Sequence, residues 1–142
     1  MRLAVVAVGR IKERGLRSVA DDYLSRIGRY VRCDEIEVRD AAGLTRALPA
    51  GARVVALEVD GLALDSEAFA RRLERWGSQG KGVIAFVIGA ADGIPKELSA
   101  RADERLSLSS MTLPHRLARV VLLEQLYRAM TILRGEPYAR EG

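Results

Sequence analysis

The sequence predicts an α/β fold in which helices cover both faces of a mainly parallel sheet. Three short apolar runs are almost unbroken, as in strands that are buried on both faces; they are Leu3–Val8, Val54–Val59 and Val83–Ile88. The segments between them show helical spacing, and strands that alternate with helices favour parallel pairing. A length of 142 residues is typical of one domain, which we expect to span residues 1–142.

The first half of the chain is expected to hold two strands and two helices. After the run Leu3–Val8, apolar residues recur at helical spacing over residues 16–31, which indicates an amphipathic helix. Cys33–Val38 alternates in part between apolar and polar residues, as a second strand does. A short helix over Ala41–Leu48 is expected to stop before Pro49, because proline cannot continue the helical hydrogen-bond pattern.

The third strand, Val54–Val59, is expected to break at Asp60 and Gly61, a pair typical of turns. The helix that follows has one apolar face. Asp65 or Ser66 marks its start, because a short side-chain oxygen can accept hydrogen bonds from the free N–H groups of the first helical turn.

Three further elements follow this helix, which is expected to end at Gly77. Val83–Ile88 is an uninterrupted apolar strand, Pro95–Ala102 is expected to form a short helix, and Leu106–Leu108 a short strand. Because strands and helices continue to alternate, these elements extend the same sheet.

The last element is a helix over about Leu117–Leu133, and it carries two apolar stripes. One stripe runs through Leu123 and Met130, and the other through Leu122 and Leu126. A helix with two apolar stripes has only a narrow wet face, so we expect it to be buried on two sides.

Composition and charge narrow the class of protein. No apolar run approaches the roughly 18 residues of a membrane helix, and the run after Met1 is too short for a signal peptide, so we expect a cytoplasmic protein. Cys33 is the only cysteine, which excludes an internal disulfide and a cysteine-based zinc site. The net charge of +4 permits nucleic-acid binding. A coding bias toward arginine would give the same balance in a small-molecule enzyme.

Three segments are candidates for a ligand site. Ligands of parallel α/β sheets bind beyond the carboxyl ends of strands, and these ends are expected at Leu57–Gly61, Gly89–Gly93 and Leu108–His115. The glycine loop matches neither a dinucleotide fingerprint nor a phosphate-binding P-loop, and a tight turn would explain its glycines equally well. Residue spacing alone therefore names no reaction.

His115 is the only histidine. One histidine cannot form a His-rich metal site and no zinc-binding motif is present, so we expect no metal. Its ordinary pKa suits a general base near neutral pH, and a purely structural role agrees with the sequence as well. Hydroxyl residues crowd Ser107–Thr112 without a nucleophile-elbow motif, and we expect them to cap this loop and the next helix.

The C-terminal third carries a distinctive pattern. It reads Leu-Ser-Leu-Ser-Ser-Met-Thr-Leu-Pro-His from Leu106 to His115, and it continues with Arg119-Val and with Glu124-Gln-Leu-Tyr-Arg-Ala. This pattern resembles the RlmH family, the pseudouridine N3-methyltransferases of large-subunit ribosomal RNA in the SPOUT class. The first strand, the glycine loop and the Gly-Glu-Pro-Tyr ending are similar too, so the resemblance covers almost the whole chain.

The resemblance implies a fold, a reaction and an assembly. The family folds as a parallel α/β sheet whose C-terminal segment threads a loop into a deep trefoil knot, a rare exception to the rule that chains are unknotted. It transfers a methyl group from S-adenosylmethionine to N3 of a pseudouridine, in an intersubunit hairpin of 23S rRNA within assembled ribosomes. The family's enzyme is a homodimer with a composite active site and requires no metal.

The resemblance also implies roles for individual residues. Tyr138 and Arg140 match tail residues that reach the RNA in the partner's active site, and His115 matches a Pro-His pair whose role is open. The S-adenosylmethionine pocket would be formed by Leu57, Gly89, Leu108, Ser109, Ser110, Met111, Thr112 and Leu113.

Four positions depart from the family pattern, among them Ala91 in place of a proline and Leu62 in place of a basic residue. Ala139 stands where the family's tail usually has histidine, and Ala90 replaces the second glycine of the loop, where it would restrict positive φ and narrow the pocket rim. These changes leave an alternative open: a diverged, non-catalytic RNA- or ribosome-binding factor on the same knotted fold.

Overall fold

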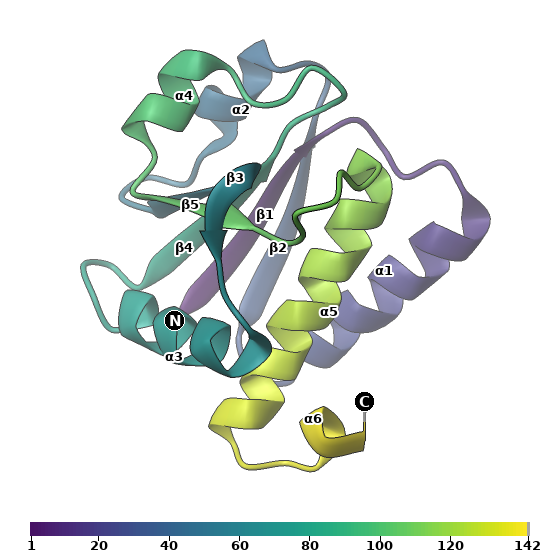
Figure 1. Ribbon diagram of the computed structural model, residues 1–142, viewed down its shortest axis with the longest axis vertical. Coiled ribbons are helices and arrows are strands. Elements are labelled where there is room, and N and C mark those ends of the chain that lie inside the picture. The colour runs from purple at the N-terminus through teal and green to yellow at the C-terminus, as the bar shows by residue number, and fades with distance from the viewer. Residues whose placement is uncertain (142) are drawn as a thin grey trace.

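A five-stranded parallel sheet forms the centre of the molecule (Figure 1). The structure is a computed structural model and describes residues 1–141. The strand order is β2-β1-β4-β3-β5, and every neighbouring pair is parallel, as predicted. The strands are β1 (Arg2–Val8), β2 (Arg32–Val38), β3 (Arg53–Ala63), β4 (Val83–Ile88) and β5 (Glu104–Ser107).

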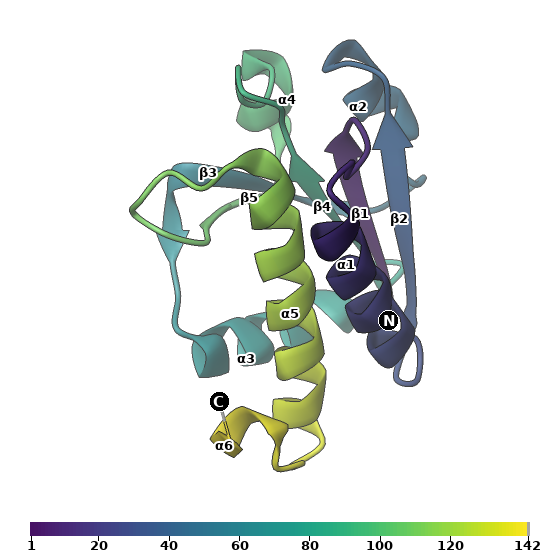
Figure 2. The ribbon, with the colours of Figure 1, turned by 90° about the vertical axis from the view of Figure 1, so that its right-hand side faces the viewer.

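Helices cover both faces of this sheet, which confirms the predicted layers (Figures 1 and 2). One face packs against the three long helices, and the other against two short ones. The long helices are α1 (Arg14–Ile27), α3 (Ser66–Gly77) and α5 (His115–Leu133), and the short ones are α2 (Ala42–Ala47) and α4 (Lys96–Arg101). Asp65 caps α3, as predicted, by accepting a hydrogen bond from the Ala68 N–H at 2.8 Å.

Each central strand contributes side chains to two separate cores. Leu3 and Val5 of β1 lie in the core beneath α1, α3 and α5, whereas Val6 between them lies in the core beneath α2 and α4. This alternation explains why the central strands are apolar without a break, because both of their faces are buried.

The third strand is longer than predicted. It continues through Asp60 and Gly61 as far as Ala63, and its partner Leu106 on β5 is paired first with Leu57 and then with Leu62. A Cβ on Gly61 would lie 2.8 Å from the carbonyl carbon of Arg105 and from the backbone nitrogen of Leu106. The glycine therefore permits close approach of two strands, and the prediction that it ends β3 was wrong.

The last long helix is buried on two sides, as its pattern predicts. Leu122, Leu123 and Leu126 have no exposed surface, and α5 lies against α1, α3 and the sheet. Helices of the same chain therefore cover most of both apolar stripes, so a dimer partner is not needed to account for them. Threading of the C-terminal segment into a knot stays a prediction.

Candidate functional site

The three predicted ligand segments meet around one cavity of about 760 Å³ at the carboxyl ends of β3 and β4. Its volume lies within the roughly 300–1,000 Å³ of small-molecule sites. Most of the predicted cofactor residues line it: Leu57, Gly89, Leu108, Ser109, Met111, Thr112 and Leu113. Ser110 belongs to the same loop but is exposed and does not line the cavity.

The floor of the cavity depends on a tight turn after β4. A Cβ on Gly89 would lie 2.3 Å from the carbonyl oxygen of Gly93, so only glycine fits at position 89. Gly93 has a φ of +81° and its N–H donates to the Ala90 carbonyl oxygen at 2.8 Å. Ala90 itself has no positive φ. The alanine that departs from the family pattern therefore causes no backbone strain here.

A second loop forms the opposite wall and is held by its own hydroxyl groups. The Ser107 hydroxyl donates to the Ser109 carbonyl oxygen at 3.0 Å, and the Ser109 hydroxyl accepts from the Met111 N–H at 2.9 Å. These bonds confirm that the serines brace the loop, whereas α5 begins after Pro114 without a side-chain cap. The Met111 side chain is 77% exposed and stands on the rim.

Acidic side chains occupy the β3 and β4 side of the rim. Glu58, Asp60 and Asp92 line the cavity, and the sequence analysis did not select them as site residues. The signal in the sequence is that Glu58 interrupts the end of an apolar run, that Asp60 follows this run, and that Asp92 lies in the glycine loop. Among the described residues, no group of three or more His, Cys, Asp or Glu is placed to hold a metal ion. The acids therefore set the charge of the rim.

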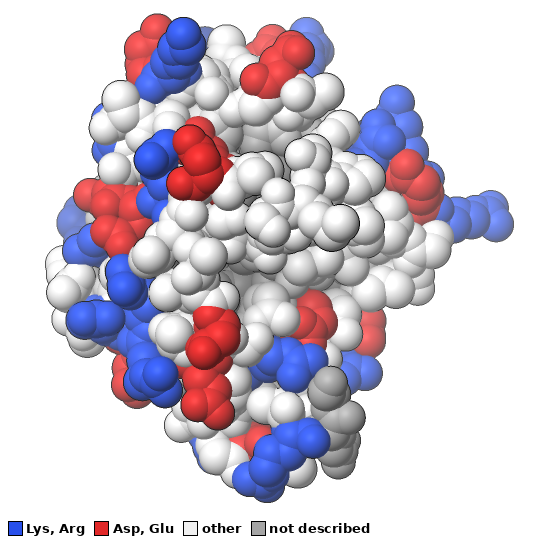
Figure 3. Space-filling model, viewed as in Figure 1, with Lys and Arg blue, Asp and Glu red and all other residues white. Residues whose placement is uncertain are grey.

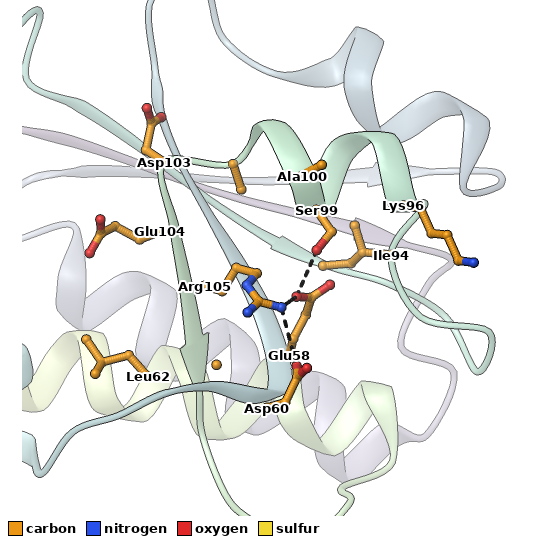
Figure 4. Close-up of a pocket in the computed structure, with 12 residues that line it drawn as sticks. Glu58, Asp60, Leu62, Ile94, Lys96, Ser99, Ala100, Asp103, Glu104 and Arg105 are labelled. Atoms are coloured by element: carbon orange, nitrogen blue, oxygen red, sulfur yellow. Dashed lines mark hydrogen bonds and ion pairs between the residues drawn. The ribbon is translucent and has the colours of Figure 1, made fainter.

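A neighbouring cavity of about 650 Å³ shares part of this acidic rim (Figure 4). There the Arg105 guanidinium lies between Glu58, at 3.2 Å, and Asp60, at 3.6 Å. Ser99 also donates to the Glu58 carboxylate at 2.9 Å. Glu58 is thus held by a cation and a hydroxyl group, while Asp92 has no ion pair within the described part of the chain.

His115 lines the cavity as the first residue of α5. Burial lowers its pKa, and the charges of Arg116 and Arg119 lower it further, because each of these effects disfavours the imidazolium form. The imidazole is therefore neutral at pH 7 and can accept a proton or a hydrogen bond.

A titration of His115 tests this protonation state. We expect its imidazole to titrate below the ordinary value of 6.5. Because the unfolded chain then binds more protons than the folded one, stability is expected to fall as the pH drops below 6.5. The measurement is the NMR signal of this single histidine, with urea unfolding at several pH values. A His115→Gln variant should lose that part of the pH dependence, and a midpoint above 6.5 would contradict the expectation.

The C-terminal tail forms a short helix, α6 (Tyr138–Glu141), that docks against α5. The Tyr138 hydroxyl donates to Glu124 at 2.8 Å, and its ring lies 4.6 Å from the Tyr127 ring. Arg128 completes the cluster by binding Glu124 at 2.7 Å. Burial raises the pKa of Tyr138, and hydrogen bonds to Tyr23 and Glu124 raise it further, so the phenol stays protonated near neutral pH. These contacts hold Tyr138 against α5.

The tail and the cavity lie at opposite ends of α5 (Figure 2). A helix of 19 residues is roughly 28 Å long. His115 stands at the cavity end, whereas Tyr138 and Arg140 follow the other end and do not line the cavity. Within one chain, the structure therefore does not bring the predicted tail residues to the predicted cofactor pocket.

Comparison with known proteins identifies relatives along the whole chain. Residues 1–139 match a family model described as "Predicted SPOUT methyltransferase". A protein of Sorangium cellulosum named "Ribosomal RNA large subunit methyltransferase H" is 62% identical, and the alignment covers 98% of this chain and 99% of that protein. A protein of the same name from Anaeromyxobacter dehalogenans is 47% identical over 97% of this chain and 99% of its own length.

Solved structures agree with this assignment at the level of the fold. A "probable methyltransferase" from Bordetella pertussis superimposes with a TM-score of 0.61 at 14% identity, over 91% of this chain and 96% of that one. An "AdoMet bound rRNA methyltransferase" from Sinorhizobium meliloti gives a TM-score of 0.51 at 16% identity, over 89% of this chain and 56% of that one. The sequence matches, supported by this likeness of fold, show that the chain belongs to the SPOUT methyltransferase family and, within it, to the RlmH group.

Proposed function

We propose that the protein transfers a methyl group from S-adenosylmethionine to N3 of a pseudouridine, in an intersubunit hairpin of 23S rRNA within assembled ribosomes. The observation that carries this proposal is the cavity at the strand ends, which is lined by most residues of the family-specific segment Leu106–His115, namely Leu108, Ser109 and residues 111–115. The names of relatives that are 62% and 47% identical over nearly the whole chain support an rRNA substrate.

The cavity suits S-adenosylmethionine in shape and charge. Leu57, Leu108 and Leu113 offer an apolar slot for the adenine ring, and Gly89 permits the tight turn that shapes the cavity at the end of β4. The acidic rim complements the positive charge of a sulfonium group. When bound, the cofactor supplies an already activated methyl group, so the chain's task is to align N3 with the methyl carbon.

His115 is the proposed proton acceptor for N3–H. It lines the cavity, and its lowered pKa keeps the imidazole neutral at pH 7. A weakly acidic N–H must lose its proton during transfer of the methyl group, and a neutral imidazole is a suitable base at that pH.

A homodimer accounts for the separation of tail and cavity. We propose that Tyr138 and Arg140 of one protomer complete the cavity of its partner. The exposed Arg140 guanidinium can bind an RNA phosphate with two parallel hydrogen bonds. The Tyr138 hydroxyl donates its one proton to Glu124 of its own chain, so Tyr138 holds in place the tail from which Arg140 projects.

Methyl transfer from labelled S-adenosylmethionine to ribosomes that lack this modification tests the proposed reaction and the proposed composite site. We expect label in N3-methylpseudouridine, identified by mass. Leu57→Trp, which fills the pocket, and Arg140→Ala, which truncates the tail, should each be inactive alone. Equal mixing with subunit exchange should restore about a quarter of the activity, because half of the dimers are mixed and each of these has one intact site.

Each outcome decides a different part of the proposal. Absence of rescue would overturn the composite site and leave the reaction itself untouched. Absence of label from the unmodified protein, with S-adenosylmethionine binding intact by calorimetry, would favour a binding factor without catalysis. In that case Ala139→His, which restores the family's tail residue, should recover transfer if the missing histidine is the cause.

A further inference from the structure

The segment that links β1 to the first residue of α1 presents three cationic side chains that have no partner among the described residues. Arg10, Lys12 and Arg14 are exposed, and none of them forms an ion pair with any residue that the structure describes. By contrast, the nearby Arg17 and Arg119 are both bound to glutamates of β2. The three charges are therefore available to a ligand.

The charge at Arg14 works against the helix that carries it. Arg14 is the first residue of α1, and the first turn of that helix contains no acidic residue. A cation at a helix N-terminus faces the positive end of the helix dipole, which is electrostatically unfavourable. Stabilisation of α1 therefore does not explain this arginine.

Hydrogen bonds of Gly9 and the buried side chain of Ile11 hold this loop in place. Gly9 takes a φ of +79°, its N–H donates to the Val38 carbonyl oxygen at 2.8 Å, and its own carbonyl oxygen accepts from Arg119 at 2.9 Å. The Ile11 side chain is only 5% exposed and is buried in the core beneath α1 and α5. The alternation of an exposed, a buried and an exposed residue makes Arg10 and Lys12 point outward from a rigid base.

An ion pair joins this loop to the edge of the cavity. Glu13 binds Arg116 of α5 at 3.0 Å, and Arg116 follows directly after His115, which lines the cavity. The first turn of α5 contains no acidic residue, so its helix dipole adds to the positive charge of this side. The three cations are thereby held beside the site and not at a random place on the surface.

The two sides of the site differ in charge. Figure 3 shows an uncharged central face, with basic side chains, and an acidic one between them, projecting from the β1–α1 side on the right. Elsewhere on the rim stand Asp92, which follows β4, and Glu58 and Asp60 of β3, which are paired with Arg105. A polyanion is therefore attracted more strongly to the side with the unpaired cations than to the rest of the rim.

We propose that Arg10, Lys12 and Arg14 bind phosphate groups of the RNA strand that carries the target nucleoside, and so orient it across the cavity. This inference rests on the proposed function, because it takes RNA as the substrate. It assigns these residues a positioning role, and none of them touches the reacting atoms.

The test is the triple variant Arg10→Ala, Lys12→Ala and Arg14→Ala. A matched control removes three exposed cations from α3 and the turn after it: Arg71→Ala, Arg75→Ala and Lys81→Ala. Both variants lose the same net charge. We expect the loop variant to raise the KM for ribosomes roughly tenfold or more at unchanged kcat, and to lower the slope of log affinity against log salt by about 2 to 3. S-Adenosylmethionine affinity should be unchanged.

The readouts separate this inference from the proposed function. An equal KM and an equal salt slope for the loop variant and the unmodified protein would overturn the inference while methyl transfer persists. An equal loss in the control variant would also overturn it, since the effect would then come from net charge alone. If the unmodified protein transfers no methyl group, the proposed function fails, and ribosome binding with its salt slope still tests the loop.

Discussion

Replacing Gly89 by alanine is expected to weaken S-adenosylmethionine binding and to destabilise the protein. The new Cβ would lie 2.3 Å from the Gly93 carbonyl oxygen and 2.4 Å from its carbonyl carbon, and neither atom belongs to a side chain that could rotate away. The turn after β4 must open, and it forms the floor of the cavity. We expect a loss of about 2–3 kcal/mol in stability and at least about a tenfold loss in cofactor affinity.

Gly93→Ala is the matched control, because its backbone is the one with positive φ and a Cβ there meets nothing within 4 Å. Gly93→Ala should lower the free energy of unfolding by only about 1 kcal/mol, because its single cost is a side chain in the left-handed backbone conformation. Calorimetric titration with S-adenosylmethionine and urea unfolding measure both effects. Equal losses in the two variants would show that conformational freedom, and not the close approach at Gly89, governs this turn.

Among substitutions outside the cavity wall, replacing Arg119 by methionine is expected to cause the largest loss of stability. Arg119 is 1% exposed, and its guanidinium binds Glu35, Glu37 and the Gly9 carbonyl oxygen. Without the guanidinium, Glu35, Glu37 and the Gly9 carbonyl oxygen each lose one partner. Breaking a buried ion pair in this way lowers the free energy of unfolding by about 3–5 kcal/mol. Since Arg17 still binds Glu35, we expect about 3 kcal/mol, or roughly 10 °C in Tm.

We expect this loss of stability because the Arg119 ion pairs are buried, and the exposed pair of Arg71 and Glu67 serves as a control. Arg71→Ala removes an exposed contact to Glu67 at 3.8 Å and should leave Tm unchanged within error. Arg119→Lys keeps the charge but has one ammonium group in place of the guanidinium fork, so it should fall between the other two variants. Scanning calorimetry ranks them. An Arg119→Met variant as stable as the original protein would show that the network contributes no net stability.

Local patterns were sufficient to predict most elements of the fold. The runs Leu3–Val8 and Val83–Ile88 became central strands at almost those bounds, because unbroken apolar sequence survives only where both faces of a sheet are covered. The rule that ligands bind at the carboxyl ends of parallel strands then placed three separate segments at one site, and the structure brings them around one cavity.

Local patterns failed where a residue's neighbour is distant in sequence. Gly61 was expected to end a strand, and its backbone instead runs against Arg105 of β5. Arg119 gives no local sign of burial, since the glutamates that hold it lie 84 and 82 positions away. No periodicity reports such pairs, because each partner alone looks like an ordinary surface charge.

Short-range periodicity and a specific motif were enough to predict the layers of the fold, the family and the segments that form the site. Which charges are buried, which stand free, and that the tail lies at the far end of α5 from His115 became clear from the folded chain alone. Ion pairing and burial depend on distances in space, and folding sets those distances between residues far apart in the sequence.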